Sequence, residues 1–226
     1  MSGAPTLPAE REAVADACRA LARDGLVHGT SGNVSARAGE LVAITPTGGR
    51  LAELDAAQVT VVGLDGRHVD GDLAPTSELD LHLGVYRRYG AGAVVHTHAP
   101  VATALSCVLD GELPCVHYEM LLLGGPIRVA PYATFGTPEL ASAALDALEG
   151  RTAALLANHG TIAHGADLAA AMQATVLLEW ASTVYWRAAT LGEPRVLGTD
   201  ERQAVVEAAV ARRYGATRPA SEEGEQ

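Results

Sequence analysis

The sequence predicts an α/β fold within a single domain. Segments whose apolar residues recur at helical spacing alternate along the chain with apolar runs short enough to be strands. Of the 226 residues, 48% are hydrophobic, so the chain can bury a substantial core. Neither an internal repeat nor an obvious linker divides it. We therefore expect one domain over residues 1–215 and a polar, mobile tail at 216–226.

Apolar residues at helical spacing predict helices in both halves of the chain. The first stops at Gly25, because glycine commonly ends a helix. The second can take Thr76 or Ser77 as its N-cap, and the third has Pro138 at its first position. The predicted helices cover residues 8–24, 78–90, 137–150, 167–190 and 200–214.

The helix predicted at 167–190 has apolar residues around most of its circumference. A helix of this kind is usually buried, and we expect part of this one to be buried against another subunit. Its large apolar residues are Met172, Val176, Leu177, Trp180, Val184 and Trp186.

Short apolar runs bounded by turn residues predict the strands. Asp65 and Gly66 stand between two such runs, which indicates a hairpin over residues 59–69. The other strands are expected at 33–37, at 41–45, from residue 93 onward, at 127–131 and at 152–160.

Charge and composition exclude several classes of function. The net charge of −11 would repel nucleic acid and anionic lipid, and no local basic patch offsets it, so the expected partner is a small molecule. All 16 basic residues are arginine, which excludes chemistry that needs a lysine amine, such as Schiff-base aldol cleavage. Apolar runs stay well below the length of about 18 residues that a membrane span needs, and the N-terminus lacks the features of a signal peptide. We therefore expect a cytoplasmic protein.

A candidate metal site begins with two histidines in an apolar strand. His96 and His98 are two residues apart, so their rings point to one face of the strand, about 6–7 Å apart along the chain, and can share a metal ion. His159 ends another predicted strand and Glu78 begins a helix, and the two would complete the ligands of a zinc site. Alternate histidines also occur as hydrogen-bonded strand residues, so the pair alone leaves both interpretations open.

Glycine and hydroxyl-rich turns form a second candidate site. They lie at residues 29–33 (GTSGN), 45–49 (TPTGG) and 75–77 (PTS). Backbone N–H groups and hydroxyls at such turns bind phosphate without a positive side chain, which suits an acidic chain without lysine. Taken singly, each turn can also be an ordinary turn without a ligand, because Gly, Ser, Thr and Pro are the residues that turns commonly contain.

Together these motifs resemble a known family. GTSGNVSAR, ITPTG, PTSELDLH, AVVHTHAPVATALS, HYEM, APYATFGTPEL and LLANHGTIA follow one another between about residues 10 and 214. In this order the chain is similar to the class II aldolase and adducin head family, and within it to the bacterial L-fuculose-phosphate aldolases. The resemblance implies a three-layer α/β/α domain with a mixed, mostly antiparallel central sheet. It also implies a fourfold-symmetric homotetramer with active sites between subunits.

The resemblance implies a role for each matching residue. One zinc ion per chain is held in the family by residues matching Glu78, His96, His98 and His159, and the glutamate leaves the metal when substrate binds to become the acid/base group. Phosphate is held by positions matching Gly32, Asn33, Thr47, Gly48, Thr76 and Ser77. Thr76 replaces the usual serine and keeps its hydroxyl.

Aromatic residues complete the implied site. Tyr118 matches a tyrosine that reaches in from the neighbouring subunit, although it also suits an interface tyrosine without a catalytic role. Phe135 matches a residue lining the aldehyde pocket, and Tyr214 matches a tyrosine of the tail that folds over the site. The remaining histidines fit no ligand pattern and are expected to be surface or hydrogen-bonded residues: His28, His68, His82, His117 and His164.

The resemblance predicts a metal-dependent aldehyde-lyase acting on a phosphorylated sugar. It would cleave a ketose 1-phosphate such as L-fuculose 1-phosphate, reversibly, to dihydroxyacetone phosphate and a short aldehyde such as lactaldehyde. Without lysine, Zn²⁺ would act as the Lewis acid, while Glu78 and Tyr118 would move protons. The alternatives are an epimerase, dehydratase or decarboxylase of the same family, or a non-enzymatic interaction domain like the adducin head. Glu78 favours the aldolase, since the epimerases tend to have aspartate there.

Overall fold

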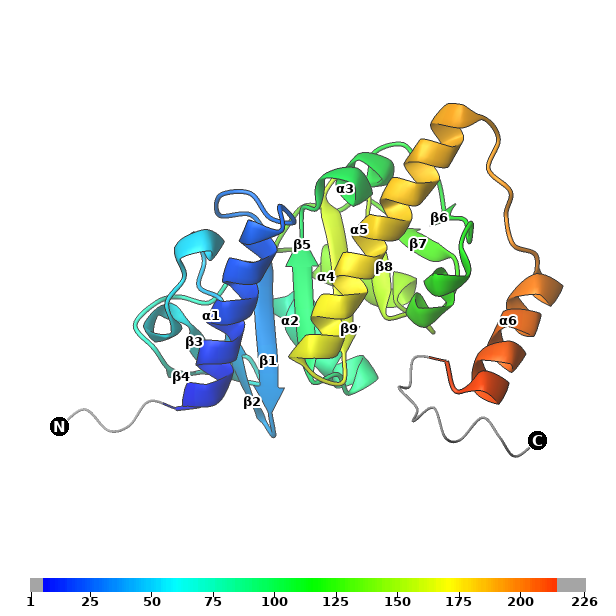
Figure 1. Ribbon diagram of the computed structural model, residues 1–226. Coiled ribbons are helices and arrows are strands. Elements are labelled where there is room, and N and C mark those ends of the chain that lie inside the picture. The colour runs from blue at the N-terminus through cyan, green and yellow to red at the C-terminus, as the bar shows by residue number, and fades with distance from the viewer. Residues whose placement is uncertain (1–5, 215–226) are drawn as a thin grey trace.

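The computed structural model describes residues 6–214, which form a mixed sheet covered by helices on both faces (Figure 1). The strands are β1 (Asn33–Ala38), β2 (Leu41–Ile44), β3 (Thr60–Gly63), β4 (His68–Asp70), β5 (Ala93–Thr97), β6 (Glu112–Leu113), β7 (Ile127–Ala130), β8 (Ala153–Leu156) and β9 (Gly160–Gly165). The helices are α1 (Pro8–Arg23), α2 (Leu79–Tyr89), α3 (Pro100–Ser106), α4 (Pro138–Ala147), α5 (Leu168–Leu191) and α6 (Thr199–Arg212), with short 3₁₀ turns η1 (Leu51–Glu53), η2 (Ala56–Gln58) and η3 (Tyr118–Leu123).

The sheet has nine strands in the order β4-β3-β2-β1-β5-β9-β8-β7-β6. Neighbouring strands are antiparallel except β7 and β8, which run parallel. The predicted α/β class with a mixed, mostly antiparallel sheet is therefore confirmed. The predicted tail at 216–226 lies outside the described residues.

Alternate residues of the central strand β5 face the two helical layers. Ala93 and Val95 pack into a core with α1, α3 and α5, whereas Val94 packs into a second core with α2 and α4. Both faces of the strand are thus buried, which explains its unbroken apolar run. Because side chains alternate, His96 continues the face of Val94 and points toward the layer of α2 and α4.

The five predicted helices start within one residue of the observed ones, but the helix predicted over residues 137–150 ends at Ala147, and α3 was not predicted. Gly25 has φ +73° just beyond α1, and Thr137 caps α4 by accepting a hydrogen bond from the Leu140 N–H at 3.3 Å. The N-cap of α2 is Glu78 rather than Thr76 or Ser77, and its side chain caps nothing. The backbone N–H of Thr76 donates to Thr45 O at 3.0 Å, so Thr76 belongs to the preceding loop and α2 starts later than predicted.

The strand predicted over residues 152–160 was too long. Strand β8 ends at Leu156, and the N–H of His159 donates to Leu156 O at 3.0 Å to close a tight turn. Asn158 lies in this turn with φ +55°, a left-handed conformation that ends a strand. The chain then continues as β9, which lies beyond the predicted strand except for Gly160 and was not predicted.

Helix α5 rests on the sheet with its small residues. Its buried residues are Ala171, Ala174, Thr175, Leu178, Ala181 and Ser182. Val176, Trp180 and Trp186 are 46%, 39% and 51% exposed, so within one chain these large residues are not buried as expected. Their predicted burial against another subunit stays a prediction. Although α5 has 24 residues, neither it nor any other helix within residues 6–214 combines the length and apolar character needed to span a bilayer.

Candidate active site

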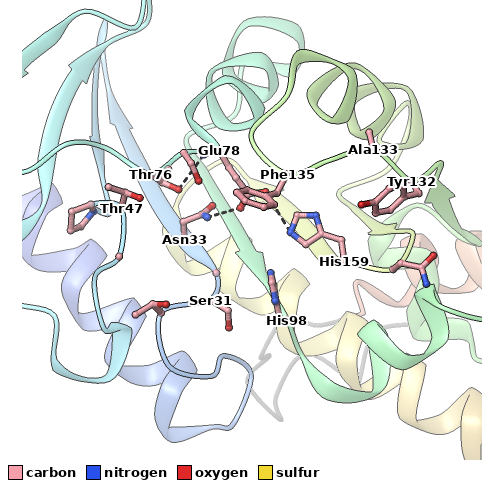
Figure 2. A pocket seen from close by; sticks show the side chains of 16 residues that line it. Ser31, Asn33, Thr47, Thr76, Glu78, His98, Tyr132, Ala133, Phe135 and His159 are labelled. Carbon is pink, nitrogen blue, oxygen red and sulfur yellow. Dashed lines mark hydrogen bonds and ion pairs between the residues drawn. The ribbon is translucent and has the colours of Figure 1, made fainter.

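A cavity of about 380 Å³ collects most of the predicted site residues at the end of the sheet where β5 stops (Figure 2). Figure 2 shows Asn33, Glu78 and His159 pointing toward one another, with Thr47 and Thr76 to one side and Tyr132 to the other. The predicted residues that line it are Gly32, Asn33, Thr47, Gly48, Thr76, Ser77, Glu78, His98, Phe135 and His159. His96 is fully buried next to them.

The structure brings the three candidate histidine ligands together. His96 lies in β5 and His98 just after it, and their Nε2 atoms are 3.1 Å apart. His159 precedes β9, which pairs with β5, and its ring centroid lies 4.8 Å from that of His96 and 5.0 Å from that of His98. One nitrogen from each ring lies within 4.8 Å of the others.

A glycine allows His159 to come this close. A Cβ atom on Gly160 would lie 2.3 Å from Thr97 O, a distance that real Cβ atoms do not tolerate. The β8–β9 turn can therefore approach the end of β5 only with glycine at this position. The neighbouring His159 is thereby held against the histidine pair.

Hydrogen bonding decides which nitrogen of His96 faces the cavity. Its Nδ1 lies 2.7 Å from Thr161 O, and since a carbonyl only accepts, Nδ1 carries the proton. When this ring is neutral, its lone pair is therefore on Nε2, directed toward His98. A metal-binding histidine commonly has this arrangement, in which the outer N–H is held by a carbonyl. Burial, followed by the charge of His96, lowers the pKa of His98 and of His159 to about 4, so both are neutral near pH 7.

Glu78 completes the cluster. Its carboxylate is 6% exposed; Oε2 lies 3.2 Å from His96 Nε2, and Oε1 lies 3.5 Å from His159 Nε2. Burial alone would raise the pKa of Glu78, but the charge of His96 and a hydrogen bond from Asn33 outweigh burial and lower it. Among residues 6–214, Oε1 has no hydrogen-bond donor.

These atoms fit a divalent cation. In a tetrahedral zinc site, bonds of about 2.0–2.1 Å place neighbouring ligand atoms about 3.3–3.4 Å apart. The separations of 3.1, 3.2 and 3.5 Å observed among the three histidines and Glu78 fall around that value. The Nε2 lone pair of His96 and the unpartnered carboxylate oxygen of Glu78 are further groups that a cation would satisfy.

The three predicted phosphate-binding turns meet at the other part of the cavity. Gly32 has φ +87°, and a Cβ atom there would lie 2.9 Å from His96 O, so this turn needs glycine to pack on β5. The Thr47 N–H donates to Ala74 O at 3.0 Å, which joins the second turn to the third. Since the backbone N–H groups of Thr47 and Thr76 are used within the protein, the donors left on these residues are their hydroxyls. Among the described residues, no arginine lines the cavity.

Asn33 is oriented differently from the other predicted phosphate ligands. Its side-chain Nδ2 donates to Glu78 Oε2 at 2.8 Å, and its Oδ1 lies 2.5 Å from His82 Nε2. From the sequence, His82 was expected only to be a surface or hydrogen-bonded residue, not a site residue. A signal was present, because Glu78 and His82 are four residues apart and so share one face of a helix.

The predicted aromatic residues divide into two groups. Phe135 lines the cavity together with Tyr132 and Ala133, and both aromatic rings are 66% exposed. Tyr118 and Tyr214, which are both described, do not line the cavity of their own chain. Their hydroxyls are 3.4 Å apart, and the two side chains are 40% and 59% exposed.

Comparisons with known proteins agree with this site. Residues 12–186 match the family described as Class II Aldolase and Adducin N-terminal domain. The chain is 43% identical to the 5-methylthioribulose-1-phosphate/5-deoxyribulose-1-phosphate aldolase of Rhodospirillum rubrum, over 87% of this chain and 89% of the relative. It is 40% identical to the 5-deoxy-D-ribulose 1-phosphate aldolase of Bacillus thuringiensis serovar kurstaki, over 87% of this chain and 93% of the relative.

A solved structure gives the same result for the fold. The chain superposes on an L-fuculose 1-phosphate aldolase with a TM-score of 0.86 and 35% identity, over 90% of this chain and 97% of that chain. The chain therefore belongs to the class II aldolase and adducin family. The relatives named above are aldolases of this metal-dependent family, so the prediction of a metal-dependent lyase is confirmed.

Proposed function

We propose that the protein is a zinc-dependent aldolase that cleaves 5-deoxypentulose 1-phosphates, including those with a methylthio group on C5, between C3 and C4. The products are dihydroxyacetone phosphate and a two-carbon aldehyde that is unsubstituted or carries the methylthio group. The observation that carries the proposal is a cavity in which His98, His159 and Glu78 lie beside three turns of neutral phosphate donors. Substrates of this length are named for relatives that are 43% and 40% identical to the chain.

L-fuculose 1-phosphate is the second candidate substrate. It is favoured by the structural match at a TM-score of 0.86, although that protein is only 35% identical. Cleavage at the same bond would release lactaldehyde, which has one more carbon and a hydroxyl. Tyr132 and Ala133 lie on the side of the cavity away from Thr47 and Thr76. Together with Phe135 they give a largely apolar surface, which suits a methyl or methylthio substituent better than a hydroxyl.

Zinc would be held by the three histidines and Glu78. When bound, it supplies a Lewis acid for the negative charge that develops on the three-carbon fragment. Glu78, buried and with Oε1 unpartnered among the described residues, would take up the proton that the C4 hydroxyl loses through Tyr118 and deliver it to C3 of that fragment after the bond breaks. The thiol-free, nitrogen-rich donor set suits zinc, and one ion per chain follows from a single such cluster among residues 6–214.

Phosphate would be bound without any positive side chain. The hydroxyls of Thr47, Thr76 and Ser77 and the backbone of Gly32 and Gly48 surround one part of the cavity. Neutral donors at converging turns stabilise a phosphate dianion, because each N–H or O–H directs a partial positive charge at it. In this proposal the phosphorylated carbon lies at the turns and the aldehyde-forming carbon lies toward Tyr132 and Ala133.

Tyr118 would act from a neighbouring subunit of a homotetramer. It is 40% exposed and lies outside the cavity of its own chain, which supports a role in another chain's site. There its hydroxyl would exchange a proton with the oxygen on C4. Tyr214, whose hydroxyl lies 3.4 Å from that of Tyr118, would contact the same site. A cytoplasmic location stays a prediction.

The test is release of dihydroxyacetone phosphate by the zinc-loaded protein. Three substrates should be compared: 5-deoxyribulose 1-phosphate, 5-methylthioribulose 1-phosphate and L-fuculose 1-phosphate. We expect the highest kcat/KM for one of the first two and loss of activity on chelation of the metal. Ribulose 5-phosphate serves as the control for epimerisation. Failure to cleave any of the three, or faster epimerisation of the control, would overturn the proposal.

A further inference from the structure

Side chains from α2 and β1 alternate along a row of hydrogen bonds, called here the α2–β1 ladder. From the cavity outward, its members are Glu78, Asn33, His82, Ser35 and Tyr86. Asn33 contacts Glu78 at 2.8 Å and His82 at 2.5 Å. Ser35 Oγ lies 2.7 Å from His82 Nδ1 and 2.6 Å from the Tyr86 hydroxyl. None of these side chains belongs to a residue more than 6% exposed, so the ladder is closed to bulk water.

The ladder follows from matching repeats of helix and strand. Glu78, His82 and Tyr86 are four residues apart, which is a rise of about 6 Å along a helix. Asn33 and Ser35 are two residues apart, which is about 6.6 Å along a strand. Because the two repeats are nearly equal, each strand side chain fits between two helix side chains. The ladder is thus built into the packing of α2 on β1.

The chemistry of its acceptors gives the ladder a single direction. The ionised carboxylate of Glu78 only accepts, so the side-chain nitrogen of Asn33 must face it. The oxygen of Asn33 then faces His82, so His82 Nε2 must carry a proton and donate. In the neutral ring Nδ1 is left as an acceptor, which receives the proton of Ser35, and Ser35 in turn accepts from Tyr86. Every donor in the ladder thus has one acceptor, and none of the three middle members, Asn33, His82 and Ser35, can rotate without breaking two hydrogen bonds.

We propose that His82 is a positioning residue that, through Asn33, holds Glu78 in place for metal binding and proton transfer. If the Asn33 amide rotated by half a turn, its oxygen would face Glu78 Oε2 and repel it. The proton on His82 Nε2 prevents this rotation, because the rotated amide would place two donors against each other. Glu78 Oε2 is thereby anchored, while Oε1 stays free of hydrogen bonds within the described chain and faces His159.

The inference rests on the proposed function only for its activity readout, since the positioning can also be measured by zinc binding. Two substitutions separate the nitrogens of His82. In His82→Gln the side-chain amide reaches the position of Nε2 and can still donate to Asn33. In His82→Asn the amide reaches only the position of Nδ1. The hydrogen bond with Ser35 is therefore kept, and the hydrogen bond with Asn33 is lost.

We expect His82→Asn to lower both the zinc affinity of the metal-free protein and kcat by about 10- to 100-fold, as is typical when a residue orienting a metal ligand is removed. KM should change little, because the phosphate turns are intact. His82→Gln should recover most of both losses. The matched control is His164→Gln, which alters a partly buried histidine whose Nε2 lies 3.2 Å from Arg151 O, away from the cavity. That variant should keep wild-type zinc affinity and kcat.

A double-mutant cycle with Asn33→Ala tests the route. If His82 acts through Asn33, adding His82→Asn to Asn33→Ala should cause almost no further loss of zinc affinity. Independent, additive losses would overturn the proposal, and so would equal zinc affinities for His82→Asn, His82→Gln and the unaltered protein. If zinc binding responds as expected but no substrate is cleaved, the proposed function fails while the positioning role of His82 stands.

Discussion

At the scale of single residues, Glu78 is the side chain whose charge matters most. Its carboxylate is held by Asn33 at 2.8 Å and faces two histidines at 3.2 and 3.5 Å. Glu78→Gln preserves size but removes the charge and the basic oxygen. We expect kcat to fall by about 10²- to 10⁴-fold, the usual contribution of a positioned acid/base group. Steady-state kinetics of the zinc-loaded variant measure this loss, and a circular dichroism spectrum identical to wild type shows that the fold is kept. Unchanged turnover would contradict the role.

His82 gives a prediction for stability against pH. Burial, followed by the charge of His96, lowers the pKa of His82 to about 3, whereas an unfolded histidine has a pKa of about 6.5. Between these values the unfolded chain binds the extra proton, so the free energy of unfolding falls as pH falls. The contribution is up to about 1.4 kcal/mol per pH unit below about pH 6.5.

The measurement is urea unfolding of the metal-free protein between pH 7 and pH 5. We expect His82→Gln to have a shallower pH dependence than wild type, since it lacks the group that titrates. Tyr86→Phe is the control, because it alters the same buried ladder without removing a histidine. Equal slopes for wild type and His82→Gln would show that His82 does not contribute.

The sequence identified single site residues where the local pattern was sufficient. His96 and His98 were recognisable because alternate strand residues share a face, and the structure places their Nε2 atoms 3.1 Å apart. His82 was not recognisable in the same way. Its role depends on Asn33 and Ser35, which lie 49 and 47 residues away in sequence. Only the packing of α2 on β1 shows that these side chains meet.

At the scale of elements, α3 is held in an unusual way. Its N-cap residue Ala99 has no side chain able to accept a hydrogen bond. Glu179 of α5 provides the acceptor instead: its two oxygens accept from the N–H groups of Val101 and Ala102 at 2.9 and 2.8 Å. Since α3 begins two residues after His98, this contact also fixes the chain where it leaves the candidate metal site.

We expect Glu179→Ala to lower the free energy of unfolding by about 1–2 kcal/mol, the cost of losing a helix cap. The negative charge of the carboxylate is also stabilised by the positive N-terminal end of the helix dipole. The free energy of unfolding of Glu179→Gln should therefore be intermediate, because this variant keeps one acceptor and loses the charge. Urea unfolding of the metal-free proteins measures both. A midpoint for Glu179→Ala equal to wild type would mean that water replaces the carboxylate without cost.

The ends of helices and strands were predicted well where a local residue marks them, and poorly where contacts with other parts of the chain determine them. Pro138, Gly25 and the Asp65-Gly66 turn mark ends that the structure reproduces. The turn before β9 was missed, because Asn158 and His159 directly follow an apolar run and only the left-handed backbone of Asn158 reveals the break. Likewise, Glu78 replaces the predicted N-cap because Thr76 is bonded to another loop, which local sequence does not indicate.

At the scale of the whole molecule, the single chain leaves a large apolar area uncovered on α5 and η3. Val176, Trp180 and Leu122 are between 39% and 60% exposed and line a hollow of about 540 Å³ that Tyr214 also borders. Contiguous apolar surface of this kind is typical of subunit interfaces. Tyr118, which lies against His117 with ring centroids 4.4 Å apart, belongs to this region rather than to its own chain's cavity. A complete site would then need two chains.

Subunit complementation tests this arrangement. Glu78→Gln and Tyr118→Phe should each have low activity as pure proteins, because every site lacks one of the two groups. If Tyr118 acts in a neighbouring subunit, unfolding and refolding an equal mixture would create interfaces that pair an intact Glu78 with an intact Tyr118. With random assembly, about a quarter of the sites would be restored, and activity should rise to about a quarter of wild type.

If both groups acted within one chain, each chain would still lack one of them, and mixing would restore nothing. Refolding each variant alone is the control, and activity of the refolded mixture no higher than the mean of these controls would contradict a shared site.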